Sequence, residues 1–439
     1  MNFTRKKSGL LILLIISAAF IGTGLSYSNA LYTNFHFDSH LRIKNNPNLQ
    51  ITNFSPNELK KILKCESPRP AANFSFALNY YFGRLKPFGY NLVNILVHTF
   101  NGILLGFFIF QALSLSKSKL NTGGGTGDRK TAFSNEAKYG MIAFFSALIW
   151  LLNPVHTQSV TYIVQRMNSL AALFFLLSLI LYIQARILQG EKDKTRSRQL
   201  KPAILFGLCI VSGILAVASK QNAAILPAFI AIYEWFFFQD LKKPSIKIIL
   251  GGILISGLLA GILALVYFDK SYISSPFPVF EEKGFTLAQR LLTEARVTVF
   301  YVSLYFFPSP ARLNIDYDYP LSLSFSQPWT TLLCLAAIVG IALLIYKKIH
   351  SDKLLIFCIV WYLGNLLIES TVLPLAIIFE HRTYLPSMLI APFIIILLFR
   401  WLPNKTITVF LLTGLIVMSG AWTFQRNQTW QSGVALWKD

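Results

Sequence analysis

The amino-acid sequence predicts an all-α polytopic membrane protein with about eleven transmembrane helices. Of its 439 residues, 54% are hydrophobic and only 13% are charged. Soluble domains average about 25% charged residues, so about half of the usual charge is missing here. The mean hydropathy is +0.53, and apolar runs that could cross about 30 Å of hydrocarbon recur along the whole chain. These observations together predict a chain that lies largely within a membrane.

The first element is an apolar stretch from Leu10 to Leu25, which follows the basic triplet Arg5-Lys6-Lys7. Ser28-Asn29-Ala30 has the small residues of a signal-peptidase site, so a cleaved signal peptide is one interpretation. The apolar run is long for a signal peptide. We therefore expect an uncleaved first transmembrane helix within residues 1–27, with the N-terminus inside, and an outer-face loop over 28–89.

The remaining apolar runs predict ten further spans. Residues 90–268 form the transmembrane core and residues 329–424 the C-terminal transmembrane helices. The predicted spans are 90–114, 139–153, 168–187, 202–218, 222–238, 248–268, 329–346, 354–372, 384–400 and 406–424. Alternating them places five basic segments inside, as the positive-inside rule requires. These segments are 115–138, 186–201, 240–247, 347–353 and 400–405.

One further segment, 287–307, is apolar but carries Arg290, Glu294 and Arg296 at helical spacing. Such charges are unusual in a helix that faces lipid. Treating it as a span would also place Lys347 and Lys348 outside. We therefore predict an interfacial or re-entrant helix within an outer-face loop over 269–328, and an outer-face tail over 425–439.

The net charge of +21 does not indicate a nucleic-acid-binding protein. A nucleic-acid footprint clusters on one soluble face, whereas these Lys and Arg residues lie in short segments between apolar runs. There they set the topology and meet anionic headgroups. The four cysteines have no spacing typical of a metal site, and no metal site is predicted.

Polar residues inside the second span share one helical stripe. Asn91, Asn94, His98 and Asn101 are spaced by three or four residues, which places them on one side of a helix. Polar side chains are costly in lipid, so they normally face a partner or a cavity. The simplest interpretation is hydrogen bonding between helices.

The outer face gathers one early carboxylate and several cations. Asp38 lies in the first outer loop, in FHFDSH, and an amphipathic stretch opens at Arg69-Pro70. The other predicted outer turns carry His156, Arg166, Lys220, Arg290, Arg296, Glu380, His381 and Arg382. Cations from separate turns suit the anionic headgroup of a lipid, with the carboxylate close by.

The residues at these positions resemble those of the GT-C membrane glycosyltransferases. The sequence is most similar to a bacterial relative of the transmembrane-and-TPR O-mannosyltransferases. The matching strings are FHFDSHLRIKNN, RPAANFSFALNYYFG, KPFGYNLVNILVH, NPVHTQSVTYIVQRMNSLAALFFLL, ASKQNAAILP, DYDYP and EHRTYLP. They cover residues from about 29 to 387, so the resemblance implies a GT-C-like helical bundle.

The resemblance implies transfer of a sugar from a polyprenyl-phosphate carrier to a protein Ser or Thr hydroxyl on the outer face. Asp38 matches the first acid of the family's acidic pair and is the expected catalytic base, while Ser39 stands where the second acid is expected. A single base and one displacement predict inversion at the anomeric carbon. The implied location is a bacterial inner membrane, with the active site on the periplasmic face.

Site roles follow from the charges and the resemblance together. The expected donor-phosphate ligands are Arg382, Arg296, Lys220 and Arg166, with Arg69, His156, Glu380 and His381 in support. The expected partners are the lipid-linked sugar and an acceptor protein or peptide. The scheme requires no cofactor, although it leaves a divalent metal ion open.

Two departures from the family pattern accompany these expectations. Of the two histidines in its His-Pro-x-His motif, only His156 is retained, because Asn153 stands at the first position. Relatives carry TPR repeats after the last span, where this sequence stops at Asp439, so we expect the acceptor-recognition module to be absent. Two other functions stay open: a lipid or sugar transporter or flippase, and an enzyme like the O-antigen ligases and polymerases.

Overall fold

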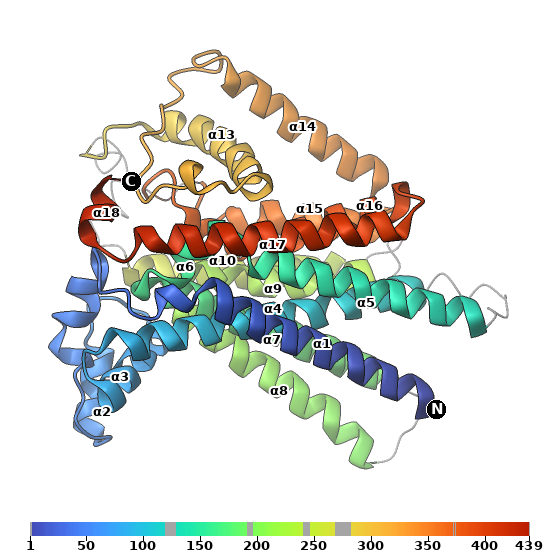
Figure 1. Ribbon diagram of the computed structural model, residues 1–439, viewed down its shortest axis with the longest axis horizontal. Coiled ribbons are helices and arrows are strands. Elements are labelled where there is room, and N and C mark those ends of the chain that lie inside the picture. Colours follow the sequence, from blue (N-terminus) through green and yellow to red (C-terminus); the bar gives the residue numbers. More distant parts are fainter. Residues whose placement is uncertain are drawn as a thin grey trace.

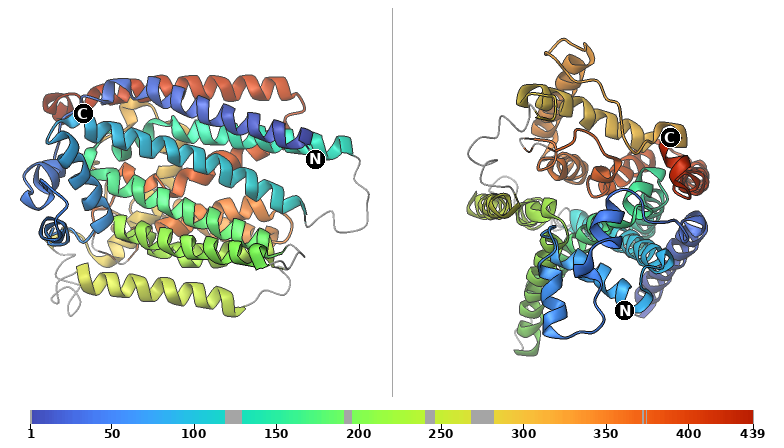
Figure 2. Two further views of the ribbon diagram at one scale, coloured as in Figure 1. Left: turned by 90° about the horizontal axis from the view of Figure 1, so that it is seen from below. Right: turned by 90° about the vertical axis from the view of Figure 1, so that its left-hand side faces the viewer.

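The computed structural model describes residues 2–118, 129–190, 196–239, 246–267, 282–371, 373 and 375–438. Every regular element among these residues is helical, as predicted. The long helices lie side by side, with their axes roughly along the longest dimension of the molecule (Figures 1 and 2). Parts of the predicted segments 115–138, 186–201, 240–247 and 269–328 lie outside the described residues.

The N-terminal part alternates long helices with short helical turns. Its α-helices are α1 (Asn2–Ser26), α2 (Pro56–Leu63), α3 (Pro70–Gly83), α4 (Pro87–Ser118), α5 (Arg129–Leu151), α6 (Thr157–Val160), α7 (Arg166–Gln189), α8 (Arg196–Ser219), α9 (Leu226–Tyr233) and α10 (Ile246–Tyr267). Helices α2, α3 and α4 begin at a proline, whose fixed φ and missing N–H suit the first helical position. Helices α2 and α3 lie together at one end of the bundle, opposite the N-terminus (Figure 1).

The C-terminal part adds α13 (Leu287–Phe306), α14 (Thr330–Lys348), α15 (Lys353–Leu366), α16 (Ile390–Trp401), α17 (Lys405–Thr429) and α18 (Gly433–Lys438). Helix α13 begins with a capping box, in which the side chains of Thr286 and Gln289 each accept a hydrogen bond from the other residue's backbone N–H. Helix α17 lies beside α1, and α18 lies at the same end of the bundle as α2 and α3 (Figures 1 and 2).

The predicted count of about eleven membrane spans is not supported, although each predicted span contains helix. Within the described residues, five helical segments are long and apolar enough to cross a membrane, or six with a bent pair that joins 135–151 to 154–160. The main reason is length. Helix α15 has 14 residues and α16 has 12, so they extend only about 21 Å and 18 Å at about 1.5 Å per residue.

Close packing of the helices depends on small residues. Helices in lipid gain little from the hydrophobic effect, so small side chains that let backbones approach are favoured at their contacts. Gly102 of α4 faces Leu151, Gly106 faces Ala147, and Gly364 of α15 faces the Phe229 ring. The helix contacts are therefore sensitive to added volume at these positions.

The polar stripe of α4 forms hydrogen bonds with other segments, as predicted. Asn91 and Asn94 donate to backbone carbonyls, Asn101 donates to a carbonyl and a hydroxyl, and His98 bonds a carbonyl and a hydroxyl. These partners are the carbonyls of Leu31, Thr33, Leu151, Val160, Ile163 and Ser169 and the hydroxyl of Tyr384. One face of α4 thereby binds backbone groups at breaks between helices.

We predict that Gly252→Ala destabilises the protein. A Cβ at Gly252 would lie 2.5 Å from the Cβ of Ala231 and 2.8 Å from the carbonyl oxygen of Pro227, so α10 would have to move away from α9. Overpacking of this kind costs about 1–3 kcal/mol, which thermal unfolding in detergent would detect. Gly257→Ala on the same helix is the control, because no described atom lies within 4 Å of its Cβ. Equal unfolding temperatures for the two variants would contradict the prediction.

Candidate functional site

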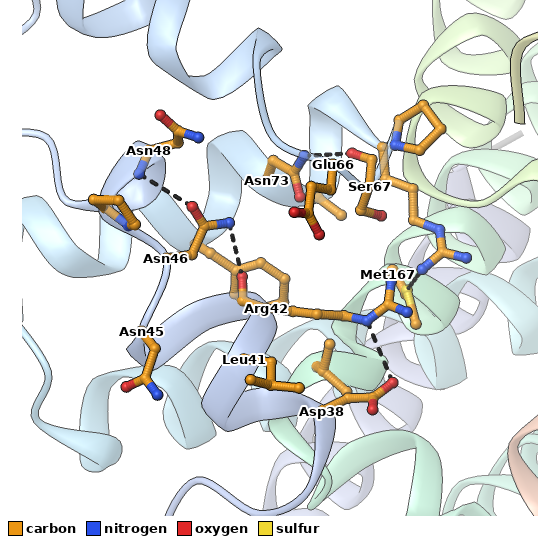
Figure 3. A pocket seen from close by; sticks show the side chains of 16 residues that line it. Asp38, Leu41, Arg42, Asn45, Asn46, Asn48, Glu66, Ser67, Asn73 and Met167 are labelled. Atoms are coloured by element: carbon orange, nitrogen blue, oxygen red, sulfur yellow. Dashed lines mark hydrogen bonds and ion pairs between the residues drawn. The ribbon is translucent and has the colours of Figure 1, made fainter.

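A cavity of about 630 Å³ lies at the end of the bundle that carries α2 and α3 (Figure 3). Its walls come from residues 38–48, residues 66–76 and the start of α7. The polar and charged side chains that line it are Asp38, Arg42, Asn45, Asn46, Asn48, Glu66, Ser67, Arg69 and Asn73. Carboxylates, guanidinium groups and amides provide both donors and acceptors, as recognition of a polyhydroxylated ligand requires.

Asp38 lines this cavity and pairs with Arg42. The Asp38 Oδ2 to Arg42 Nε distance is 3.3 Å, and the side chains are 56% and 42% exposed. An exposed ion pair of this kind is typically worth less than about 1 kcal/mol. Arg42 therefore orients the carboxylate of Asp38 without sequestering it from a ligand.

A second carboxylate, that of Glu66, lines the same cavity (Figure 3). Sequence reasoning missed it, because the resemblance directed attention to position 39. Ser39 is instead fully buried, and its Oγ accepts a hydrogen bond of 3.2 Å from the Val164 N–H. A signal was present in the sequence, since Glu66 is only three residues before Arg69.

Arg69 forms the wall between the cavity and a buried group of charges. Its Nε donates to Gln221 Oε1 at 3.1 Å, and its Nη1 contacts the sulfur of Met167, which also lines the cavity. Lys220 directly precedes Gln221, and Asn168 directly follows Met167. The Lys220 ammonium donates a hydrogen bond to the Asn168 side chain. The buried charges therefore lie directly behind the cavity wall.

Five buried charged residues form this group, which we call the charge cluster: Lys220, Arg290, Glu294, Glu369 and Arg382. Lys220 Nζ lies 2.7 Å from a Glu369 oxygen. Glu294 Oε1 lies 3.0 Å from Arg290 and 3.8 Å from Arg382. Three cations face two carboxylates, so the cluster keeps a net positive charge. Lys220 and Arg382, both predicted phosphate ligands, lie in this cluster, and the sequence did not indicate their acidic partners.

His381 connects the charge cluster to the turn around α6. Gln158 Oε1 accepts from both the backbone N–H of His381, at 2.8 Å, and its ring Nδ1, at 2.9 Å. The Gln165 amide lies 3.4 Å from the other ring nitrogen, and Asn168 donates to the His381 carbonyl. Burial and then the charge of Lys220 hold the pKa of His381 well below its usual value. The ring is therefore neutral near pH 7.

Arg166, an expected phosphate ligand, is instead fully occupied by neutral acceptors. Its Nε donates to Asn94, and its two terminal nitrogens donate to Asn79 and to the carbonyls of Ser75 and Tyr90. It is 0% exposed. These bonds join α3, α4 and α7, so the geometry favours a structural role for Arg166.

Arg296 also lies apart from the charge cluster. It follows Glu294 by two residues on α13, which places it on the opposite side of the helix. Its guanidinium donates to the Pro320 carbonyl at 2.8 Å and lies over the Tyr319 ring. The structure thus brings Arg382 and Lys220 together, but Arg296 contacts the loop before α14.

The remaining supporting residues contact other parts of the end of the bundle. His156 is fully buried among aromatic rings, including those of Trp150 and Tyr384, and neither ring nitrogen has a hydrogen-bond partner in the described part of the chain. Glu380 accepts from the Asn314 N–H and the Tyr317 hydroxyl, both at 2.7 Å. Across the described ranges, no three His, Cys, Asp or Glu side chains are grouped to hold a metal ion.

We predict that His381 makes stability depend on pH. Its pKa is lowered in the folded state, so below about pH 6.5 the unfolded chain binds a proton that the folded chain does not. Stability is then complete above that pH and falls by up to about 1.4 kcal/mol per pH unit as the pH decreases. Thermal unfolding between about pH 7 and pH 5 measures this loss. His381→Gln should show a shallower loss than wild type, and parallel curves would contradict the prediction.

Comparisons with known proteins agree with the predicted relationship. Human protein O-mannosyl-transferase TMTC2 is 29% identical over 366 residues, which cover 77% of this chain and 39% of that protein. Human TMTC3 is 23% identical over 93% of this chain and 45% of its own length, and mouse TMTC4 is 25% identical over 63% and 34%. The chain thus spans less than half the length of these curated relatives.

No protein-family model matches the sequence. No solved structure matches it either. The similarity to the O-mannosyl-transferases extends over most of the chain. The chain is an integral membrane protein that is related in sequence to the TMTC protein O-mannosyl-transferases.

Proposed function

We propose that this chain is a GT-C-type glycosyltransferase that moves a sugar from a polyprenyl-phosphate donor to a Ser or Thr hydroxyl of a protein. One observation carries the proposal: a cavity has the carboxylate of Asp38 in one wall, and Arg69 in another wall adjoins a positively charged cluster. Related proteins are named O-mannosyl-transferases, so mannose is the first sugar to test.

In this mechanism Asp38 is the general base. Its carboxylate takes the proton of the acceptor hydroxyl as the hydroxyl oxygen bonds to the anomeric carbon of the sugar. The bond from that carbon to the phosphate oxygen breaks, and the lipid phosphate leaves with the electron pair. Attack and departure occur on opposite faces, so the configuration at the anomeric carbon inverts.

The departing phosphate needs positive charge, which Arg69, Lys220 and Arg382 can provide. Both Lys220 and Arg382 already act on the Glu369 carboxylate, so they lie within electrostatic range of one another. Glu369 and Glu294 neutralise only part of the cationic charge. A phosphate near Arg69 would add the missing negative charge, and preorganised cations of this kind stabilise charge that develops on a leaving group.

We also propose that the active site faces the outer side of a bacterial inner membrane. Helix α13 carries buried charges and is not among the helices that could cross by composition. This supports an interfacial position for it.

Labelling with a membrane-impermeant thiol reagent tests this topology. We expect a cysteine at Ser351, between α14 and α15, to be protected in intact cells and to react only after permeabilisation. A cysteine at Asp316 should react from outside; both positions are exposed in the structure. Labelling of Ser351→Cys from the outside would show that the proposed orientation is wrong.

Mass spectrometry of outer-face proteins tests the activity. We expect hexose-modified Ser and Thr peptides in cells with the gene and none in deletion cells. Asp38→Asn retains the shape of the side chain but cannot accept the proton, so it should lower transfer by about 10²–10⁴-fold. Asp316→Asn, an exposed acid outside the cavity, is the control. Near-normal modification by a well-expressed Asp38→Asn protein would remove Asp38 from the mechanism.

A further inference from the structure

The backbone that carries Asp38 is held by contacts on each side of it. Phe37 has a φ of +44°, a left-handed conformation that a residue with a bulky side chain rarely adopts without support from its surroundings. The His36 ring is hydrogen-bonded to the Trp430 carbonyl at 2.9 Å. Ser39 Oγ accepts from Val164 at 3.2 Å. Residues before and after Asp38 are therefore fixed to other segments.

Tyr162 makes the contact at Asp38 itself. Its hydroxyl oxygen accepts a hydrogen bond of 2.9 Å from the backbone N–H of Asp38. The Tyr162 ring stacks on Trp430, with centroids 5.4 Å apart and an angle of 27° between the planes, and meets the Phe37 ring edge-on. Tyr162 is only 9% exposed and Trp430 only 1%. The pair is thus a buried support for the Asp38 segment, and neither ring lines the cavity.

The two aromatic residues come from distant parts of the chain. Tyr162 lies in the turn before α7, and Trp430 directly follows α17. Asn427 connects the same two regions, because its side chain accepts from the Thr161 hydroxyl at 2.6 Å and donates to the Ser26 carbonyl at 3.1 Å. The position of the Asp38 backbone is therefore set jointly by the end of α1, the turn before α7 and the end of α17.

We propose that Tyr162 and Trp430 are positioning residues for Asp38. With the backbone fixed, the carboxylate can move only through its own side-chain torsions, and Arg42 restricts these further. A general base must lie within hydrogen-bond reach of the acceptor hydroxyl. A displacement of about 1 Å can cost about 10²-fold in rate. This inference rests on the proposed function only in assigning a catalytic purpose to the held carboxylate.

Tyr162→Phe is the sharpest test, because it removes only the hydroxyl and retains the ring that stacks on Trp430. We expect faster amide hydrogen exchange in peptides that cover Asp38, since its N–H loses its acceptor. With a short-chain polyprenyl-phosphate mannose and a synthetic Ser/Thr peptide, kcat should fall about 10-fold while KM for the peptide stays unchanged. Trp430→Phe, which shortens the stacking surface, should produce the same pattern more weakly.

Tyr305→Phe is the control, because Tyr305 is a buried tyrosine whose hydroxyl has no hydrogen-bond partner among the described residues. Unchanged exchange at Asp38 in Tyr162→Phe would overturn the proposal, as would faster exchange with an unchanged kcat. If wild-type protein transfers no sugar from this donor, the proposed function fails for it. The exchange measurement then decides alone whether Tyr162 holds the Asp38 segment.

Discussion

The hydrogen bonds along one face of α4 are the constraint on which the rest of the structure depends. Backbone N–H and C=O groups inside a membrane must be paired, because lipid offers no partner and each unpaired group costs several kcal/mol. The chain breaks its helices near residues 31–33, 151–153 and 160–165, where carbonyls would lack partners. The side chains of Asn91, His98 and Asn94 form hydrogen bonds with backbone carbonyls at these breaks. The breaks can therefore lie beside a transmembrane helix.

The same hydrogen bonds place the candidate site. Asn91 fixes the carbonyl of Thr33 just before the Asp38 segment, and Asn94 fixes the turn that carries Tyr162. Asn94 also accepts from Arg166, which in turn binds α3 next to the cavity. A sequence that only needed to cross the membrane would not require these amides. These amides are costly in lipid, but they satisfy irregular backbone at membrane depth. That irregular backbone brings the side chains of the candidate site to one end of the bundle.

The charge cluster behind the cavity has a different physical basis. Burying charges costs several kcal/mol per ion, and paired geometry recovers this only in part, so buried ion pairs are weak evidence for stability. Lys220–Glu369 and Arg290–Glu294–Arg382 are both buried and still keep an excess of positive charge. The phosphate of the proposed donor would balance this excess of positive charge. Arg166 differs, because its neutral acceptors satisfy it without any ligand.

The sequence by itself determined the membrane class, the all-helical fold, the positions of the apolar helices and the bonding role of the α4 stripe. Composition and helical periodicity are local properties, so each can be measured in a single segment of the sequence. It also predicted that Asp38, Lys220 and Arg382 belong to one end of the molecule. Only the tertiary structure decided which charges meet. Arg296 lies across α13 from Glu294, Arg166 is occupied by neutral acceptors, and Glu66 joins Asp38 in the cavity. Such pairings depend on the orientation of helices distant in sequence, which the pattern of charges along the chain does not specify.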